Sequence, residues 1–161
     1  MDWALPNGNV CFIDELDLPI MAQFRWRSVF IAGITYVVTN VRKGDRRVTA
    51  YLHRIIMRPP PGVHIDHIDH DGLNNQRSNL RLCSRSENMR NQVKRRRATS
   101  SRFKGVSRAG HRWCAQLEID GKHIRLGSHD TEEQAAAAYN AGAVLYFGSF
   151  AHVNALPSET T

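Results

Sequence analysis

The sequence predicts an α+β fold in two parts. A β-rich N-terminal hairpin region leads into a β-β-α unit, and a three-stranded antiparallel sheet with one packed helix follows. Three observations support this prediction: segments rich in Val, Thr and Tyr joined by short glycine turns, an Asn-rich loop between two short strands, and a Thr-x-x-Gln motif before an alanine-rich run. A chain of 161 residues suits one or two small domains. We expect them at residues 1–97 and 98–161, with cores at 52–95 and 101–154.

The N-terminal region is predicted to be a hairpin on a small core. Residues 34–42 and 46–52 are the expected strands, and Lys43-Gly44-Asp45 is the turn between them. The core is expected to come from Trp3, Phe12, Leu16, Leu18, Phe24 and Trp26. The region also carries Arg25, Arg27, Arg42, Lys43, Arg46 and Arg47. These side chains could line a DNA backbone, but scattered surface charge is the favoured interpretation.

Residues 63–92 hold three Asp, three His and five Asn, a density that asks for a chemical explanation. A strand is expected to end in Asp66-His67, and a second strand covers residues 80–83. Ser84 and Glu87 form a capping box that starts a helix, with Asn88 just inside it. A strand-end Asp-His and a first-turn Asn can converge, which brings a carboxylate and an amide oxygen to a hard cation with an imidazole beside them.

At these residues the chain resembles the HNH nucleases, the ββα-metal family, in the zinc-free form found in homing and phage endonucleases. His67, Asn79 and Asn88 occupy the three signature positions, and Asn88 replaces the last histidine. The resemblance implies that Asp66 and Asn88 hold one divalent ion, Mg²⁺ with Mn²⁺ possible, and that no structural zinc is present. It further implies that His67 activates water and that Asn79 ties down the loop that orients His67.

Two neighbouring polar groups are open to more than one interpretation. His53-Arg54 precedes a short apolar helix that must end before Pro59-Pro60-Pro61. The pair either is a hydrogen-bonded junction or contacts phosphate, and a His-Arg pair at this distance is also seen in the HNH family. The segment 69–71 lacks the remaining acids of a calcium loop, so a polar turn is favoured there.

Composition favours a polyanionic partner in a reducing compartment. Lys and Arg number 22 against 15 Asp and Glu, and the pI is about 9.8. The three Cys are far apart and form no C-x-x-C pair, which argues against a zinc ribbon or a disulfide framework. No apolar run reaches membrane-spanning length and no signal peptide is recognised. We therefore expect an intracellular, cytoplasmic protein with no membrane partner and no small-molecule cofactor.

Residues 90–104 contain seven basic residues and no acid. Such a run can be a solvated helix end, where cations suit the helix dipole. Its position between two modules favours phosphate contacts instead. The central residues of the run are Lys94, Arg95, Arg96 and Arg97.

The last 60 residues predict strands at 103–107, 112–119 and 122–128, the last two joined by an Asp120-Gly121 turn. Trp113, Ala115, Leu117 and Ile119 alternate onto one face of the sheet. Thr131-x-x-Gln134 caps a helix to about Tyr146 that covers this face. The opposite, polar face stays exposed and is expected to contact the bases of DNA.

This segment, about 101–154, resembles the plant ethylene-response-factor or Apetala-two DNA-binding domain. The match runs through Phe103-Lys104-Gly105-Val106, Trp113, Leu126-Gly127, Asp130-Thr131-Glu132-Glu133-Gln134-Ala135-Ala136, Ala138-Tyr139 and Phe147-Gly148. The resemblance implies that the sheet enters the major groove, with contacts from Lys104, Ser107, Gln116, Glu118, His123 and Arg125. DNA contacts are also expected from Arg108 and Arg112. Ser107 and Arg125 depart from the residues common in the plant proteins, so the plant target sequence does not transfer.

The two resemblances together are characteristic of phage and mobile-element endonucleases. They predict a metal-dependent endonuclease that hydrolyses phosphodiester bonds in double-stranded DNA and is targeted by its C-terminal domain. An inactive, sequence-specific DNA-binding regulator is the alternative, against which the intact Asp66, His67, Asn79 and Asn88 argue. An RNA-binding protein has less support, because the reading sheet lacks paired stacking aromatics.

Overall fold

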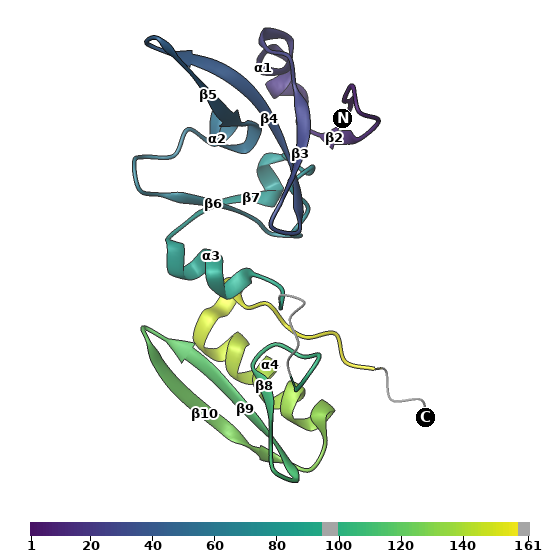
Figure 1. The fold of residues 1–161 in the computed structure, drawn as a ribbon, viewed down its shortest axis with the longest axis vertical. Helices are drawn as coiled ribbons and strands as arrows, with labels where there is room; N and C mark the ends of the chain where they lie inside the picture. Colours follow the sequence, from purple (N-terminus) through teal and green to yellow (C-terminus); the bar gives the residue numbers. More distant parts are fainter. Residues whose placement is uncertain (95–99, 158–161) are drawn as a thin grey trace. The chain divides into compact units, whose positions relative to one another are not determined.

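A computed structural model of the chain describes residues 1–94 and 100–157 (Figure 1). The chain divides into two compact units, Met1–Arg85 and Ser86–Thr161, and each is described by itself. Small antiparallel sheets and a few helices make up both units, which confirms the predicted α+β class. The boundary between the units falls after the first residue of the helix that carries Asn88, whereas the functional boundary at residues 97 and 98 stays a prediction.

The first unit contains three small sheets and short helices. Its elements are β1 (Asp2–Ala4), β2 (Val10–Phe12), η1 (Glu15–Asp17), α1 (Leu18–Gln23), β3 (Arg27–Ile31), β4 (Ile34–Lys43), β5 (Arg46–Tyr51), α2 (Leu52–Met57), β6 (His64–His67), η2 (Arg77–Asn79) and β7 (Leu80–Cys83). The β1-β2 and β6-β7 pairs and the β3-β4-β5 sheet are all antiparallel. The β4-β5 hairpin, the helix before the prolines and the β6-β7 pair agree with the sequence prediction.

One apolar core joins the N-terminal segment to the β6-β7 pair. Its buried members are Leu5, Cys11, Ile13, Met21, Trp26, Val37, Leu52, Ile56, Ile65 and Leu80. The prediction that Phe12 and Leu16 belong to this core is wrong, because both are exposed. Alternation along β2 turns Cys11 inward and Phe12 outward.

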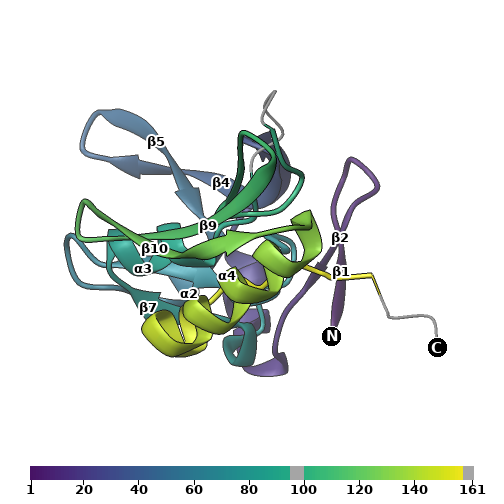
Figure 2. The same cartoon turned by 90° about the horizontal axis from the view of Figure 1, so that it is seen from below.

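The second unit is a three-stranded sheet with one long helix. Its elements are α3 (Arg85–Asn91, beginning one residue before the unit), β8 (Val106–Ala109), β9 (Arg112–Ile119), β10 (Lys122–His129), α4 (Glu132–Phe147) and η3 (Gly148–Phe150). The strand order is β10-β9-β8, and α4 lies along one face of the sheet (Figure 2). Both hydrogen bonds of the predicted Thr131-Gln134 capping box are present at the start of α4.

Close packing under α4 explains where β8 begins. The prediction placed this strand at 103–107, but it starts at Val106. Gly105 has φ +71°, and a Cβ there would lie 1.9 Å from the buried ring of Tyr139. A left-handed turn is needed before the strand can pair, and only glycine fits it.

Candidate nuclease site and nucleic-acid interface

The β6-β7 pair positions the proposed metal ligand and the proposed base at its end. Asp66 lies opposite Arg81, and His67 lies opposite Leu80. Both Asp66 and His67 are buried, at 6% and 7% exposure. Burial of two ionisable side chains at consecutive positions of a short strand is costly, and such sites are candidates for function.

Arg81 forms a close ion pair with the carboxylate of Asp66. Its Nε and Nη2 donate to Oδ2 at 2.9 and 2.6 Å. A buried carboxylate requires such a cationic partner, because burial removes its hydration. Sequence reasoning missed Arg81, since it can be matched with Asp66 only when the register of the two strands is known.

The imidazole of His67 is held in an aromatic surround. Its ring centroid lies 4.9 Å from that of His53 and 6.0 Å from that of Tyr36. Burial lowers the pKa of His67 below 6.5, while the nearby carboxylate of Asp69 opposes the shift. The neutral form therefore dominates at neutral pH, which is the form that a general base needs.

The neighbours His53 and Arg54 differ in burial: the first side chain is buried and the second is exposed. His53 is buried against Tyr36, Tyr51 and His67, and burial lowers its pKa to about 3, so it is uncharged at neutral pH. The Nδ1 atom of His53 has no hydrogen-bond partner among the residues that the structure describes. Arg54 is exposed and donates to the carbonyl oxygen of Val63 at 3.3 Å. Tyr36 and Tyr51 were not predicted as site residues, because their long separation from His67 in the chain leaves no local signal.

Asn79 ties together the loop that follows His67. Its Nδ2 donates to Asp69 Oδ1 at 2.8 Å and to the Asn74 carbonyl at 2.9 Å, and its Oδ1 accepts from the Asp69 amide at 3.0 Å. The amide of Ile68 donates to the Asn79 carbonyl at 2.9 Å. Three of these four bonds hold residues 68 and 69, immediately after His67, and the fourth holds Asn74 further along the loop. The Asp69 and Asp71 side chains accept backbone amides two residues on, as in the predicted polar turn.

The N-terminal segment, through residues 11 and 12, contacts residues 73–75 of this loop. The Phe12 amide donates to the Leu73 carbonyl, and the Asn75 amide donates to the Phe12 carbonyl. Asn75 is fully buried, and its Nδ2 reaches the sulfur of Cys11 at 3.6 Å. The first part of the chain is therefore a structural base for the loop.

The metal ligands predicted from the sequence are the carboxylate of Asp66 and the side-chain amide oxygen of Asn88. Within residues 1–94 and 100–157, no three His, Cys, Asp or Glu side chains gather in one place. Mg²⁺ is commonly coordinated by one or two carboxylates together with substrate phosphates and water. The carboxylate of Asp66 is consistent with this type of coordination. Asn88 is half-buried in α3 of the second unit.

The polar face of the C-terminal sheet is exposed as predicted. Cross-strand pairs join Gln116 to Arg125 and Glu118 to His123, so these four exposed side chains lie on one face. The apolar face opposite them packs Ala115 and Leu117 against α4. A β-bulge between Arg125 and Gly127 interrupts the β9-β10 pairing near its middle.

The other predicted contacts on β8 and β9 have partners within the unit. Ser107 is half-buried opposite Cys114. Arg108 lies over the Trp113 ring at 5.6 Å and donates to the Gly110 carbonyl, and Arg112 pairs with Asp130 at 3.1 Å. Both arginines remain exposed, so their surface positions are compatible with DNA contacts.

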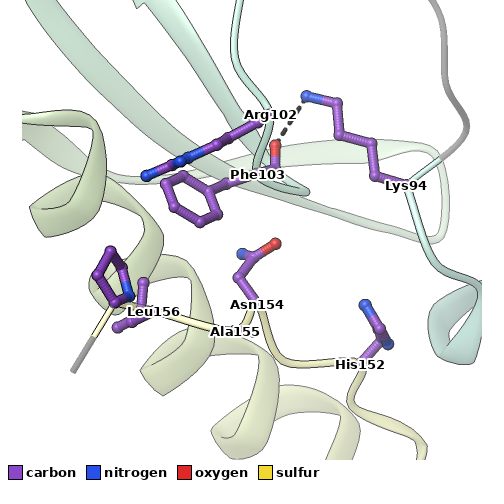
Figure 3. Close-up of a pocket in the computed structure, with 8 residues that line it drawn as sticks. Lys94, Arg102, Phe103, His152, Asn154, Ala155 and Leu156 are labelled. Atoms are coloured by element: carbon purple, nitrogen blue, oxygen red, sulfur yellow. Dashed lines mark hydrogen bonds between the residues drawn. The ribbon is translucent and has the colours of Figure 1, made fainter.

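Two lysines of the basic run join the end of α3 and the residues after it to the segment that precedes β8, by reciprocal contacts. Lys104 Nζ donates to the carbonyls of Arg90 and Gln92 at 2.6 Å each. Lys94 Nζ donates to the carbonyls of Ser101 and Phe103 at 2.7 Å each, the latter drawn in Figure 3. Burial lowers the pKa of Lys104 to about 8. The predicted contacts Arg95, Arg96 and Arg97 lie outside the described residues.

A cleft of about 550 Å³ adjoins this contact (Figure 3). Lys94, Arg102, Phe103 and Asn154 are among its lining residues. Arg102 pairs with Glu133 at 2.9 Å, and Asn154 accepts from the Lys104 amide at 2.7 Å. Much of the polar lining therefore already serves the fold of the unit.

Comparison with known proteins identifies the class. Residues 50–90 match the model of the HNH endonuclease family, and nearly the whole chain aligns with one viral member. The chain belongs to the HNH endonuclease family; it is a nuclease, a hydrolase that acts on nucleic acid. The viral member is an uncharacterized HNH endonuclease of Acanthamoeba polyphaga mimivirus, 31% identical over 151 residues, which are 92% of this chain and 76% of that protein.

Two further similarities cover parts of the chain. Protein 3.8 of Escherichia phage T7 is 36% identical over 94 residues, 57% of this chain and 76% of that protein. An ethylene-responsive transcription factor of Arabidopsis thaliana is 40% identical over 58 residues, 34% of this chain but only 14% of the plant protein. Nucleases of the HNH family generally use a divalent metal ion. None of the helices in the described part of the chain is long and apolar enough to cross a membrane.

Proposed function

We propose that this nuclease is a metal-dependent, homing-type endonuclease for double-stranded DNA, encoded by a phage or mobile element, with its C-terminal unit as the targeting domain. The observation that carries the chemistry is the buried, neutral His67 beside the buried carboxylate of Asp66. The viral relatives support the origin, and the partial similarity to plant transcription factors supports the targeting role.

In this mechanism, each proposed site residue has a separate role. Asp66 and Asn88 are the proposed ligands of one Mg²⁺ or Mn²⁺ ion, whose chemistry is stabilisation of negative charge on the scissile phosphate and the leaving oxygen. The imidazole of His67 takes the proton from the attacking water. Asn79 keeps His67 oriented through its bonds to residues 68, 69 and 74.

The surroundings of His67 suit a base that works near neutral pH. Tyr36 and His53 shield the ring from bulk water, and shielding favours the uncharged imidazole. Arg81 keeps the carboxylate of Asp66 in place on the neighbouring strand. Arg54, exposed at the edge of this cluster, is a proposed contact for substrate phosphate.

The test is cleavage of supercoiled plasmid with Mg²⁺, Mn²⁺ or EDTA. His67→Ala should lower the cleavage rate by about two or more orders of magnitude and leave DNA affinity nearly unchanged. His64→Ala, on the same strand, is the matched control and should cleave like the wild type. A His67→Ala variant that cleaves at the wild-type rate would refute the assignment of the base.

A second variant tests the metal ligand separately from the base. Asp66→Asn keeps an oxygen that can accept from Arg81 but removes the carboxylate charge. Calorimetry should show lost Mn²⁺ binding, and circular dichroism should show a retained fold. Unchanged Mn²⁺ affinity would remove Asp66 from the ligand set.

A further inference from the structure

The β4-β5 hairpin extends well beyond the core of the first unit (Figure 1). Val38 pairs with Tyr51 at its base, and Lys43 pairs with Arg46 at its tip. At about 3.4 Å per residue, the strand from Val38 to Lys43 is about 17 Å long. Every side chain from 42 to 49 is exposed, so this arm contributes little to the core.

One face of the arm is continuous with the aromatic surround of His67. Side chains alternate along each strand, so residues 36, 38, 40 and 42 of β4 share a face with residues 47, 49 and 51 of β5. At the base of this face, Tyr36 and Tyr51 contact each other and His53, and Tyr36 also contacts His67. Towards the tip, the same face carries the pair Asn40-Thr49 and then the pair Arg42-Arg47.

The tip places like charges directly opposite each other. Arg42 faces Arg47, and Lys43 faces Arg46. Like charges in directly opposed positions destabilise a hairpin. Among the residues that the structure describes, none of the four makes an ion pair, and Asp45 in the turn is the one acid between them in the chain. The hairpin supplies no acidic partner for these four cations. Their clustering therefore favours binding to a separate, polyanionic molecule.

We propose that the face with Asn40, Arg42, Arg47 and Thr49 binds the phosphate backbone of duplex DNA beside the nuclease site. The inference rests on the proposed function, because the DNA is the substrate of the same unit. Arginine binds phosphate through two parallel N–H donors, and Asn and Thr donate single hydrogen bonds to phosphate oxygens. An arm of about 17 Å covers about five base steps of 3.4 Å.

The two faces of the tip allow a matched experiment in the full chain. Arg42→Gln with Arg47→Gln removes two charges from the proposed face, and Lys43→Gln with Arg46→Gln removes two from the opposite face. Affinity for a random-sequence DNA duplex is measured over a range of salt concentrations. Random sequence is suitable because phosphate contacts do not depend on the bases.

The first pair of substitutions should reduce the slope of log affinity against log salt by about 1.8, since each neutralised phosphate contributes about 0.9. If the two proteins bind equally at 1 M salt, this slope change corresponds to an affinity loss of about 60-fold at 0.1 M salt. The control pair should lower the slope by less than half as much. The thermal midpoint of the first variant should stay equal or rise, because the opposed charges are gone. A purely structural role for these arginines would lower it.

Equal slope changes for the two pairs would overturn the inference, because they would reflect only the overall positive charge of the protein. An unchanged slope for Arg42→Gln with Arg47→Gln would also overturn it. The proposed function is judged separately on plasmid cleavage. If no metal ion supports cleavage but the two faces still differ in the salt slope, the cleavage proposal fails and the backbone contact stands.

Discussion

The ion pair between Arg77 and Asp17 offers a direct test of how the N-terminal segment supports the nuclease loop. Arg77 Nη2 and Nε donate to the two carboxylate oxygens of Asp17 at 2.7 and 3.1 Å, and the Arg77 amide donates to Asp14 at 2.8 Å. The side chain of Asp17 is 1% exposed, whereas that of Arg77 is 40% exposed. The two partners therefore lose different amounts when the pair is broken.

Arg77→Ala leaves the buried carboxylate of Asp17 without its cation. Breaking a buried pair in this way costs about 3–5 kcal/mol, and the partial exposure of Arg77 puts the expected cost near 3 kcal/mol. Asp17→Asn leaves a guanidinium that can reach water, so its expected cost is about 1 kcal/mol. Against a total stability of about 5–15 kcal/mol, the first change is large and the second is small.

Urea unfolding followed by tryptophan fluorescence measures these costs. In a Trp113→Phe background the remaining Trp3 and Trp26 both lie in the first unit, so the signal reports on that unit alone. The double variant of Arg77 and Asp17 should cost about 2 kcal/mol less than the sum of the single variants. Arg46→Ala, an exposed arginine at the hairpin tip, is the control and should change stability by less than about 0.5 kcal/mol. The reasoning is refuted if Asp17→Asn costs more than Arg77→Ala.

The remaining predictions concern the base, the packing of the second unit and base reading. The pKa of His67 lies below 6.5, so the cleavage rate should stay level from pH 8 down to about 6.5 and fall only at lower pH, as the imidazole takes up a proton; a pH-rate profile measures this. Lys104→Met removes two hydrogen bonds from an ammonium to carbonyls near the end of α3, and thermal unfolding should show a loss of about 2 kcal/mol. Gly105→Ala places a Cβ against Tyr139 at positive φ and should cost about 3 kcal/mol in the same assay. Arg125→Ala should remove about 1–3 kcal/mol of discrimination at one base pair, and an unchanged preferred site after binding-site selection would exclude that contact.

Sequence alone determined the elements whose causes are local. The Thr131-Gln134 capping box sets the start of α4, and the turns at 43–45 and 120–121 set two hairpins, because each depends on residues within a few positions of one another. The placement of Asp66 and His67 at the end of a short strand was likewise predictable from its pattern of side chains. The outward turn of Phe12 was not, since a short apolar strand does not reveal which alternate residues face the core. The exposure of Leu16, which lies in η1, was not predicted either.

Tertiary structure alone decided which distant groups surround the candidate site. Arg81 faces Asp66 only through the register of β6 and β7, and Tyr36 reaches His67 from a strand about 30 positions earlier in the chain. Lys104 was predicted from sequence as a DNA contact, yet its ammonium is engaged with the end of α3. The physical reason is common to these cases: the free energy of a buried charge depends on whichever partner the folded chain brings within hydrogen-bonding distance, and no local pattern of residues records that partner.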